Sequence, residues 1–152
     1  MEKIALASIA DSLYEQDYYA WTEQQVALLQ AERLAEIDIA HLVEEIEDMG
    51  RSQRRAVKSA LLVVLIHLLK YRFQPTHRTQ SWRATLREHR RRLRDEFADS
   101  PSLEPYAERV FAECYQDACE DAADETGLPL ATFPPVCPFT LEHVLDRNFL
   151  PD

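Results

Sequence analysis

Apolar residues recur at every third or fourth position along the whole chain, and no segment alternates as a half-buried strand would. Only Gly50 and Gly127 are glycines, the residue that weakens helices most after proline. We therefore predict an all-α fold in one domain, residues 1–152. It is a helical bundle with one long central helix at about 38–72, a helical hairpin to 81–98, a fourth long helix, and a Pro-rich C-terminal strap with a short last helix.

The long helix depends on whether Gly50 interrupts it, because glycine often ends a helix. At 100° per residue the apolar positions before and after Gly50 share one face, which a turn between them would not preserve. The pattern therefore predicts one helix about 50 Å long. Its inner face carries Ile39, Leu42, Val43, Ile46, Met49, Val57, Ala60, Leu61, Val64, Leu68 and Tyr71.

Residues that cap helices predict where the other helices begin and end. The predicted caps are Ser12 with Glu15 for a first helix that ends near Arg33, Asp38 for the long helix, Ser81 for the third, Ser100-Pro101 for the fourth and Thr140 for the last. Gly127 is predicted to end the fourth helix.

Positive charge is confined to one block of the sequence. Residues 51–94 hold thirteen of the seventeen Lys and Arg against one acid, Glu88, whereas residues 1–50 hold twelve acids against two bases and residues 95–152 hold fourteen against two. This partition either pairs unlike helices inside the fold or keeps a basic surface for anions in a chain whose net charge is −10.

Arginines of the third predicted helix form one stripe beside its apolar stripe. Such a stripe could follow the phosphates of a nucleic acid or bind another anion. Pairing with acids, inside the fold or in a dimer, is the favoured interpretation, because the fourth helix is rich in them. The anion-binding candidates are Arg83, Arg87, Arg90, Arg94, Lys70 and Arg72.

Three histidines could meet near the turn between the long and third helices: His67, His77 and His89. A histidine on an apolar face is more often a hydrogen-bonded core residue than a metal ligand, so we predict no metal and no cofactor. These three remain the candidates for a metal site. Glu45 and His67 are predicted to be polar residues at the edge of the core, with Glu45 capping or bridging helices.

The three cysteines indicate a reduced, cytoplasmic protein. Cys114 and Cys119 lie about 140° apart around one helix and cannot pair with each other. No basic segment followed by an apolar run opens the chain. The longest apolar run, Ala60–Leu69, is far shorter than the roughly 20 residues that cross a bilayer, so no membrane partner is expected.

A series of short motifs covers nearly the whole chain. They are Tyr14-Glu15-Gln16-Asp17 with Trp21, Leu42-Val43-Glu44-Glu45-Ile46-Glu47-Asp48-Met49-Gly50, His67-Leu68-Leu69-Lys70, Gln74-Pro75, Ser81-Trp82-Arg83, Pro101-Ser102-Leu103, Glu125-Thr126-Gly127-Leu128 and Cys137-Pro138. In these motifs the chain resembles a bacterial family catalogued as domain of unknown function 29. The resemblance implies an all-helical, prokaryotic cytoplasmic protein and no activity. His89 departs from it, since the family more often has a non-titrating polar residue such as Gln there.

No P-loop, Gly-rich phosphate loop, helix-turn-helix, HExxH or GxSxG motif occurs in the sequence. We therefore expect a non-enzymatic interaction module that presents long helices to a second copy of itself or to a protein partner. The first alternative is an anion or nucleic-acid binder that uses the arginine stripes of residues 51–94. The second is a metal or hydrolytic site around His67.

Overall fold

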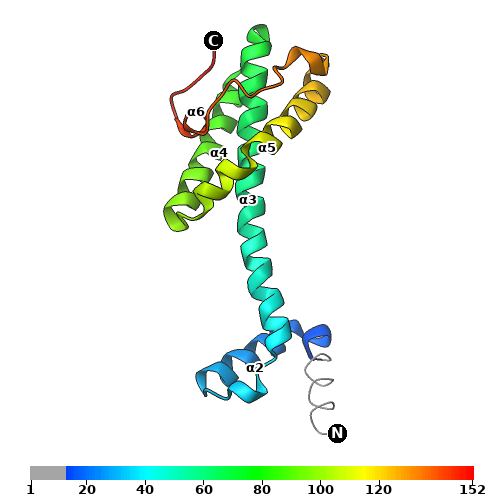
Figure 1. Ribbon diagram of the computed structural model, residues 1–152, viewed down its shortest axis with the longest axis vertical. Coiled ribbons are helices and arrows are strands. Elements are labelled where there is room, and N and C mark those ends of the chain that lie inside the picture. Colours follow the sequence, from blue (N-terminus) through cyan, green and yellow to red (C-terminus); the bar gives the residue numbers. More distant parts are fainter. Residues whose placement is uncertain (1–12) are drawn as a thin grey trace. The chain divides into compact units, whose positions relative to one another are not determined.

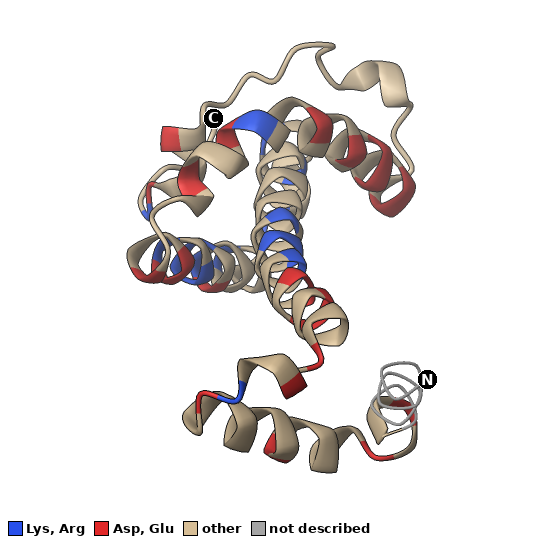
Figure 2. Cartoon of the chain, turned by 60° about the horizontal axis from the view of Figure 1, so that its bottom comes forward, with Lys and Arg blue, Asp and Glu red and all other residues tan. Residues whose placement is uncertain are grey.

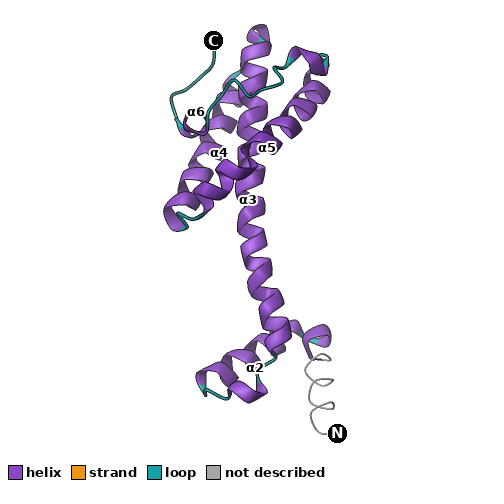
Figure 3. Ribbon diagram, viewed as in Figure 1, coloured by secondary structure: helices purple, strands orange, loops and turns teal. Residues whose placement is uncertain are grey.

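The computed structural model describes residues 13–152, and within that range every regular element is a helix (Figure 1). The elements are α2 (Tyr18–Gln30), η1 (Leu34–Glu36), α3 (Ile39–Phe73), η2 (Pro75–His77), α4 (Gln80–Asp99), α5 (Leu103–Thr126), η3 (Leu130–Thr132) and α6 (Leu141–Leu145). Figure 3 shows these helices joined by short loops, with the longest irregular stretch after α5. The all-α prediction and the long central helix are confirmed.

Contacts within the chain separate two compact units, residues 1–50 and 51–152. The first is called the N-terminal unit and is described from residue 13; the second is the C-terminal unit. The assignment of the chain to one domain stays a prediction. None of the helices in residues 13–152 is long and apolar enough to cross a lipid bilayer.

The C-terminal unit is built around a continuous apolar core. The α3 residues predicted to face inward from Val57 to Tyr71 are all buried. Leu86, Leu93 and Phe97 of α4 meet them, and α5 adds small residues and Cys114. Each fully buried aliphatic side chain contributes about 1.5–3 kcal/mol to the free energy of unfolding, so this core is the main source of stability of the C-terminal unit. Lys and Arg lie on α3 and α4, whereas acids line α5 (Figure 2).

Two predicted helix boundaries are confirmed by their local geometry. Gly127 ends α5 in the left-handed conformation, with φ 73°, which glycine adopts without strain. The Thr140 side chain accepts a hydrogen bond from the His143 amide and caps α6. All three cysteines are free.

Two predicted caps were wrong, and the first predicted helix is interrupted. Residues 13–16 are helical, but α2 begins anew after Asp17, which accepts a hydrogen bond from the Ala20 amide at 3.0 Å; the predicted cap Ser12 lies outside the described residues. Thr79, not Ser81, caps α4, because its extended backbone directs the hydroxyl at the Trp82 amide. α5 begins at Leu103, since residues 101 and 102 form a turn instead of the first helical positions.

Replacing Gly50 with alanine is expected to raise the free energy of unfolding by up to about 1 kcal/mol, the usual penalty of glycine in a helix interior. A Cβ at this position meets no heavy atom within 4 Å, so nothing opposes the gain. Urea unfolding followed by circular dichroism measures it. Gly127→Ala is the matched control and should lower stability, because its φ of 73° strains any L side chain. A loss of stability in Gly50→Ala would contradict a continuous helix in solution.

Candidate functional site

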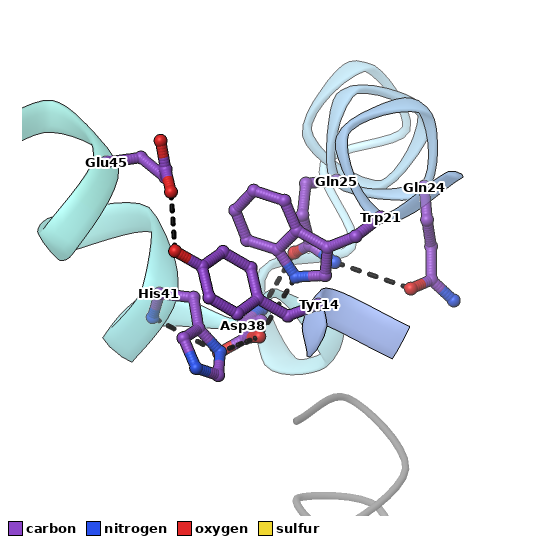
Figure 4. A network of polar contacts seen from close by, with 7 residues as sticks. All are labelled: Tyr14, Trp21, Gln24, Gln25, Asp38, His41 and Glu45. Carbon is purple, nitrogen blue, oxygen red and sulfur yellow. Dashed lines mark hydrogen bonds and ion pairs between the residues drawn. The ribbon is translucent and has the colours of Figure 1, made fainter. Parts of the chain in front are cut away.

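A network of polar side chains joins α2 to the beginning of α3 within the N-terminal unit (Figure 4). Asp38 lies at its centre. Its Oδ2 accepts from the Trp21 indole at 3.0 Å and contacts His41 Nδ1 at 2.6 Å. The Asp38 amide donates to Gln25 Oε1 at 2.8 Å, and Oδ1 caps α3 by accepting from the His41 amide. The predicted cap is therefore confirmed, and it also anchors α2.

Glu45 extends this network along α3. It accepts hydrogen bonds from the hydroxyls of Tyr14, at 2.6 Å, and Tyr18, at 2.7 Å. The Tyr14 ring stacks on His41, with ring centroids 3.9 Å apart. Glu45 thus ties two tyrosines that precede or begin α2 to the second turn of α3.

The charges in the network are fixed by these contacts. The hydrogen bond to Glu45 raises the pKa of Tyr14 to about 12, so the phenol remains a donor at neutral pH. Burial alone would raise the pKa of Asp38, but hydrogen bonds from His41 and Trp21 outweigh it and leave that pKa below its ordinary value. Asp–His pairs orient nucleophiles in hydrolases, but here both side chains make contacts between helices: Asp38 caps α3 and accepts from Trp21, and the His41 ring stacks on Tyr14. The network therefore holds the unit together.

The large apolar side chains of the N-terminal unit are mostly exposed. Only Trp21 and Gln25 are buried in residues 13–50. Four α3 residues, called the α3 stripe, are 48–64% exposed: Ile39, Val43, Ile46 and Met49. Five residues of α2 and the following turn, called the α2 group, are 46–73% exposed: Tyr18, Tyr19, Val26, Leu29 and Leu34.

The α3 stripe corrects the prediction that these positions face a core. Within this unit the polar network meets α3 at Asp38, His41 and Glu45, which lie on another side of the helix from Ile39 and Ile46. The other described residues of the N-terminal unit therefore leave the α3 stripe uncovered.

Two of the predicted anion-binding residues bind backbone instead of acids. Arg90 is only 2% exposed; its Nε donates to the Val144 carbonyl at 2.8 Å and its Nη2 to the His143 carbonyl at 3.1 Å. Arg94 donates to the Leu145 carbonyl at 3.3 Å. These carbonyls end α6 and have no partner within that helix, and the helix dipole favours a cation there.

Lys70 and Arg72 lie in the last turn of α3, and Arg83 lies in the first turn of α4. Lys70 pairs with Glu125 of α5 at 2.8 Å and lies over the Trp82 ring. Arg72 lies over the ring of the adjacent Phe73. Arg83 donates to the Tyr71 hydroxyl at 3.0 Å. Only Lys70 of these three shows the predicted pairing with an α5 acid, as does Lys58, which contacts Glu113 at 2.7 Å.

The three candidate histidines each make a local contact. His67 donates to the Val63 carbonyl at 2.8 Å and His89 to the Thr85 carbonyl at 3.0 Å, whereas His77 contacts the neighbouring Thr76 hydroxyl. Burial lowers the pKa of His67, which keeps it neutral. In residues 13–152 no group of three or more His, Cys, Asp or Glu side chains is placed to hold a metal ion.

The cysteines are also poorly suited to chemistry. Cys114 and Cys119 are buried, and Cys137 is half-buried. Burial raises the pKa of the Cys114 and Cys137 thiols to about 11, so both are protonated at neutral pH. A thiol in that state is a weak nucleophile.

Sequence reasoning missed two residues that organise these sites. Arg90 was assigned to the arginine stripe beside the apolar one, although it lies four residues after Leu86 and three before Leu93, which puts it on their buried face. Asp38 was recognised as a cap but not as the partner of Trp21. The polar Gln25 on the inner stripe of α2 was the available signal for that network.

A family model matches residues 13–150 and is described as a domain of unknown function, DUF29. No match was found among curated proteins or among solved structures.

Proposed function

The chain belongs to the DUF29 family, which is defined without an activity, and we propose that it is a non-enzymatic cytoplasmic docking module. Its N-terminal unit binds a basic amphipathic helix of a partner protein. The observation that carries this proposal is the exposure of the α3 stripe and the α2 group. The proposal agrees with the interaction role expected from the sequence and adds the class of partner, a basic amphipathic helix.

The spacing of the α3 stripe supports a helical partner. Ile39, Val43 and Ile46 are separated by four and three residues, the spacing of a face that packs against another helix. Monomeric proteins seldom expose contiguous apolar patches of more than a few hundred Å² unless the patch binds something. Residues 13–50 bury only Trp21 and Gln25 and leave nine large apolar side chains accessible, so this part of the unit is better suited to binding than to folding around its own core.

Charge supports a basic partner over a second copy of the same unit. Residues 13–50 contain ten acids and one base, Arg33. Two such surfaces brought together would repel, whereas a cationic helix would be attracted and oriented by the same field.

A designed helical peptide of leucine and lysine, about 18 residues long, is expected to bind with micromolar affinity, in a salt-dependent manner. The double variant Ile39→Ser/Ile46→Ser should weaken binding about tenfold or more, because burying one isoleucine contributes about 1.5–3 kcal/mol. Fluorescence anisotropy of the labelled peptide measures both. Val136→Ser, which removes an even more exposed apolar side chain from the C-terminal unit, should leave binding unchanged.

Two controls separate this proposal from its competitors. A leucine and glutamate peptide of the same pattern should bind much more weakly, and equal binding would show that charge does not select the partner. Sedimentation equilibrium of the protein alone should give a monomer. A dimer that Ile39→Ser/Ile46→Ser converts to monomer would instead identify a second copy as the occupant and overturn the proposal.

A further inference from the structure

A small open pocket in the C-terminal unit is lined mainly by arginines. It has a volume of about 210 Å³ and lies between α4 and the segment that follows α6. Arg83, Arg87 and Arg90 line it from α4, at positions that share one helix face, and Arg147 lines it from the other side. Asn148 adds an amide from the same segment.

Most of the positive charge in this pocket is not neutralised by acids. Arg90 and Arg83 donate to carbonyls and to the Tyr71 hydroxyl, respectively, which are neutral acceptors. Among the described residues, neither Arg87 nor Arg147 forms an ion pair with a carboxylate. Asp146 is the acid whose charge reaches Arg90, and it is outnumbered by the four guanidinium groups.

Four guanidinium groups around one pocket repel one another unless an anion lies among them. Guanidinium groups are planar forks of N–H donors that match the oxygens of a phosphate, and they bind it by charge-assisted hydrogen bonds. The volume is below the roughly 300–1,000 Å³ of sites for drug-sized ligands, so it suits one phosphoryl group better than a whole nucleotide.

From this geometry we propose a binding site for a terminal phosphoryl dianion, as carried by inorganic phosphate or a phosphate monoester, with Arg87 and Arg147 as its principal ligands and Asn148 as an additional donor. The bound group joins α4 to the segment after α6. Its source is either inorganic phosphate or the phosphorylated end of a larger molecule. This site is independent of the docking surface on the N-terminal unit and does not rest on that proposal.

Isothermal titration with inorganic phosphate, at constant ionic strength maintained with chloride, tests the site directly. We expect saturable binding in the submillimolar range. Arg87→Gln and Arg147→Gln should each weaken it about tenfold or more, since each removes a charged ligand. Both variants should fold normally, because neither side chain makes an ion pair in the described structure. Arg91→Gln removes an exposed arginine of the same helix outside the pocket and should change affinity less than about twofold.

Further titrations identify the source and exclude a nucleic-acid surface. Phenyl phosphate is a monoester and dimethyl phosphate a diester. Binding of phosphate and phenyl phosphate indicates an open phosphoryl site, and binding of phenyl phosphate alone indicates a phosphorylated molecule as the source. Equal affinity for dimethyl phosphate or for a short single-stranded oligonucleotide would overturn the terminal phosphoryl site in favour of backbone binding. Absence of binding by both inorganic phosphate and phenyl phosphate, or an equal loss of affinity in Arg91→Gln, would also overturn it.

Discussion

Arg90→Met is expected to lower the free energy of unfolding by about 3 kcal/mol. Hydrogen bonds to a charged group contribute about 1.5–3 kcal/mol each, and Arg90 donates two, to the carbonyls of His143 and Val144. Methionine keeps a long unbranched stem in the buried space, so the loss reports hydrogen bonding more than packing. Urea unfolding gives the free energy, and hydrogen exchange should show that α6 loses protection first.

Arg91→Met is the matched control for this change. Arg91 is exposed, on the next residue of α4, and its replacement alters the net charge equally. It should change stability by no more than about 0.5 kcal/mol. If Arg90→Met behaved in the same way, water would be an adequate substitute for the guanidinium, and the attachment of α6 would have to depend on the burial of Val144 and on the hydrogen bond from Arg94.

Trp21→Ala is expected to cost about 3–5 kcal/mol, the usual loss for a buried tryptophan. Trp21 is 2% exposed and is the only large apolar side chain buried in residues 13–50. That loss should exceed what the rest of the unit can offset. Hydrogen exchange with mass spectrometry should therefore show α2 and the first turns of α3 unprotected, while the core of the C-terminal unit keeps its protection.

Trp21→Phe separates the two roles of this residue. Phenylalanine keeps an aromatic ring but cannot donate to Asp38, so it should lower stability by about 1.5–3 kcal/mol, the contribution of a hydrogen bond to a charged group. Unchanged exchange in residues 13–50 of Trp21→Ala would mean that the polar network, not the indole, holds α2 in place.

The sequence predicted α3 well because helical phase is a property of neighbouring residues. A shared apolar face on both sides of Gly50 needs no knowledge of other elements, and the helix runs from Ile39 to Phe73. The same pattern could not tell which part of the face is covered. Val57 is fully buried and Ile46 is 64% exposed, although both fit one stripe, because burial depends on which other elements of its own unit pack on each residue.

The functional residues were predicted less well, for a related reason. Composition placed the arginines in one block, but it could not assign each to its acceptor. Arg90 binds carbonyls contributed from more than fifty residues away in sequence, a contact that no local spacing encodes. Thr79 replaced Ser81 as the cap of α4 because two hydroxyl residues compete at that point and the backbone conformation decides between them.

The attachment of α6 through its carbonyls has an evolutionary consequence. Arg90 and Arg94 recognise the main chain of residues 143–145, which every amino acid provides in the same form. Mutations in the side chains of that short helix can therefore accumulate without breaking its connection to α4, provided that Val144 remains apolar and the helix still ends at the same place. The constraint falls on α4, where the guanidinium groups have no substitute, so selection should preserve the two arginines more strictly than the segment that they hold.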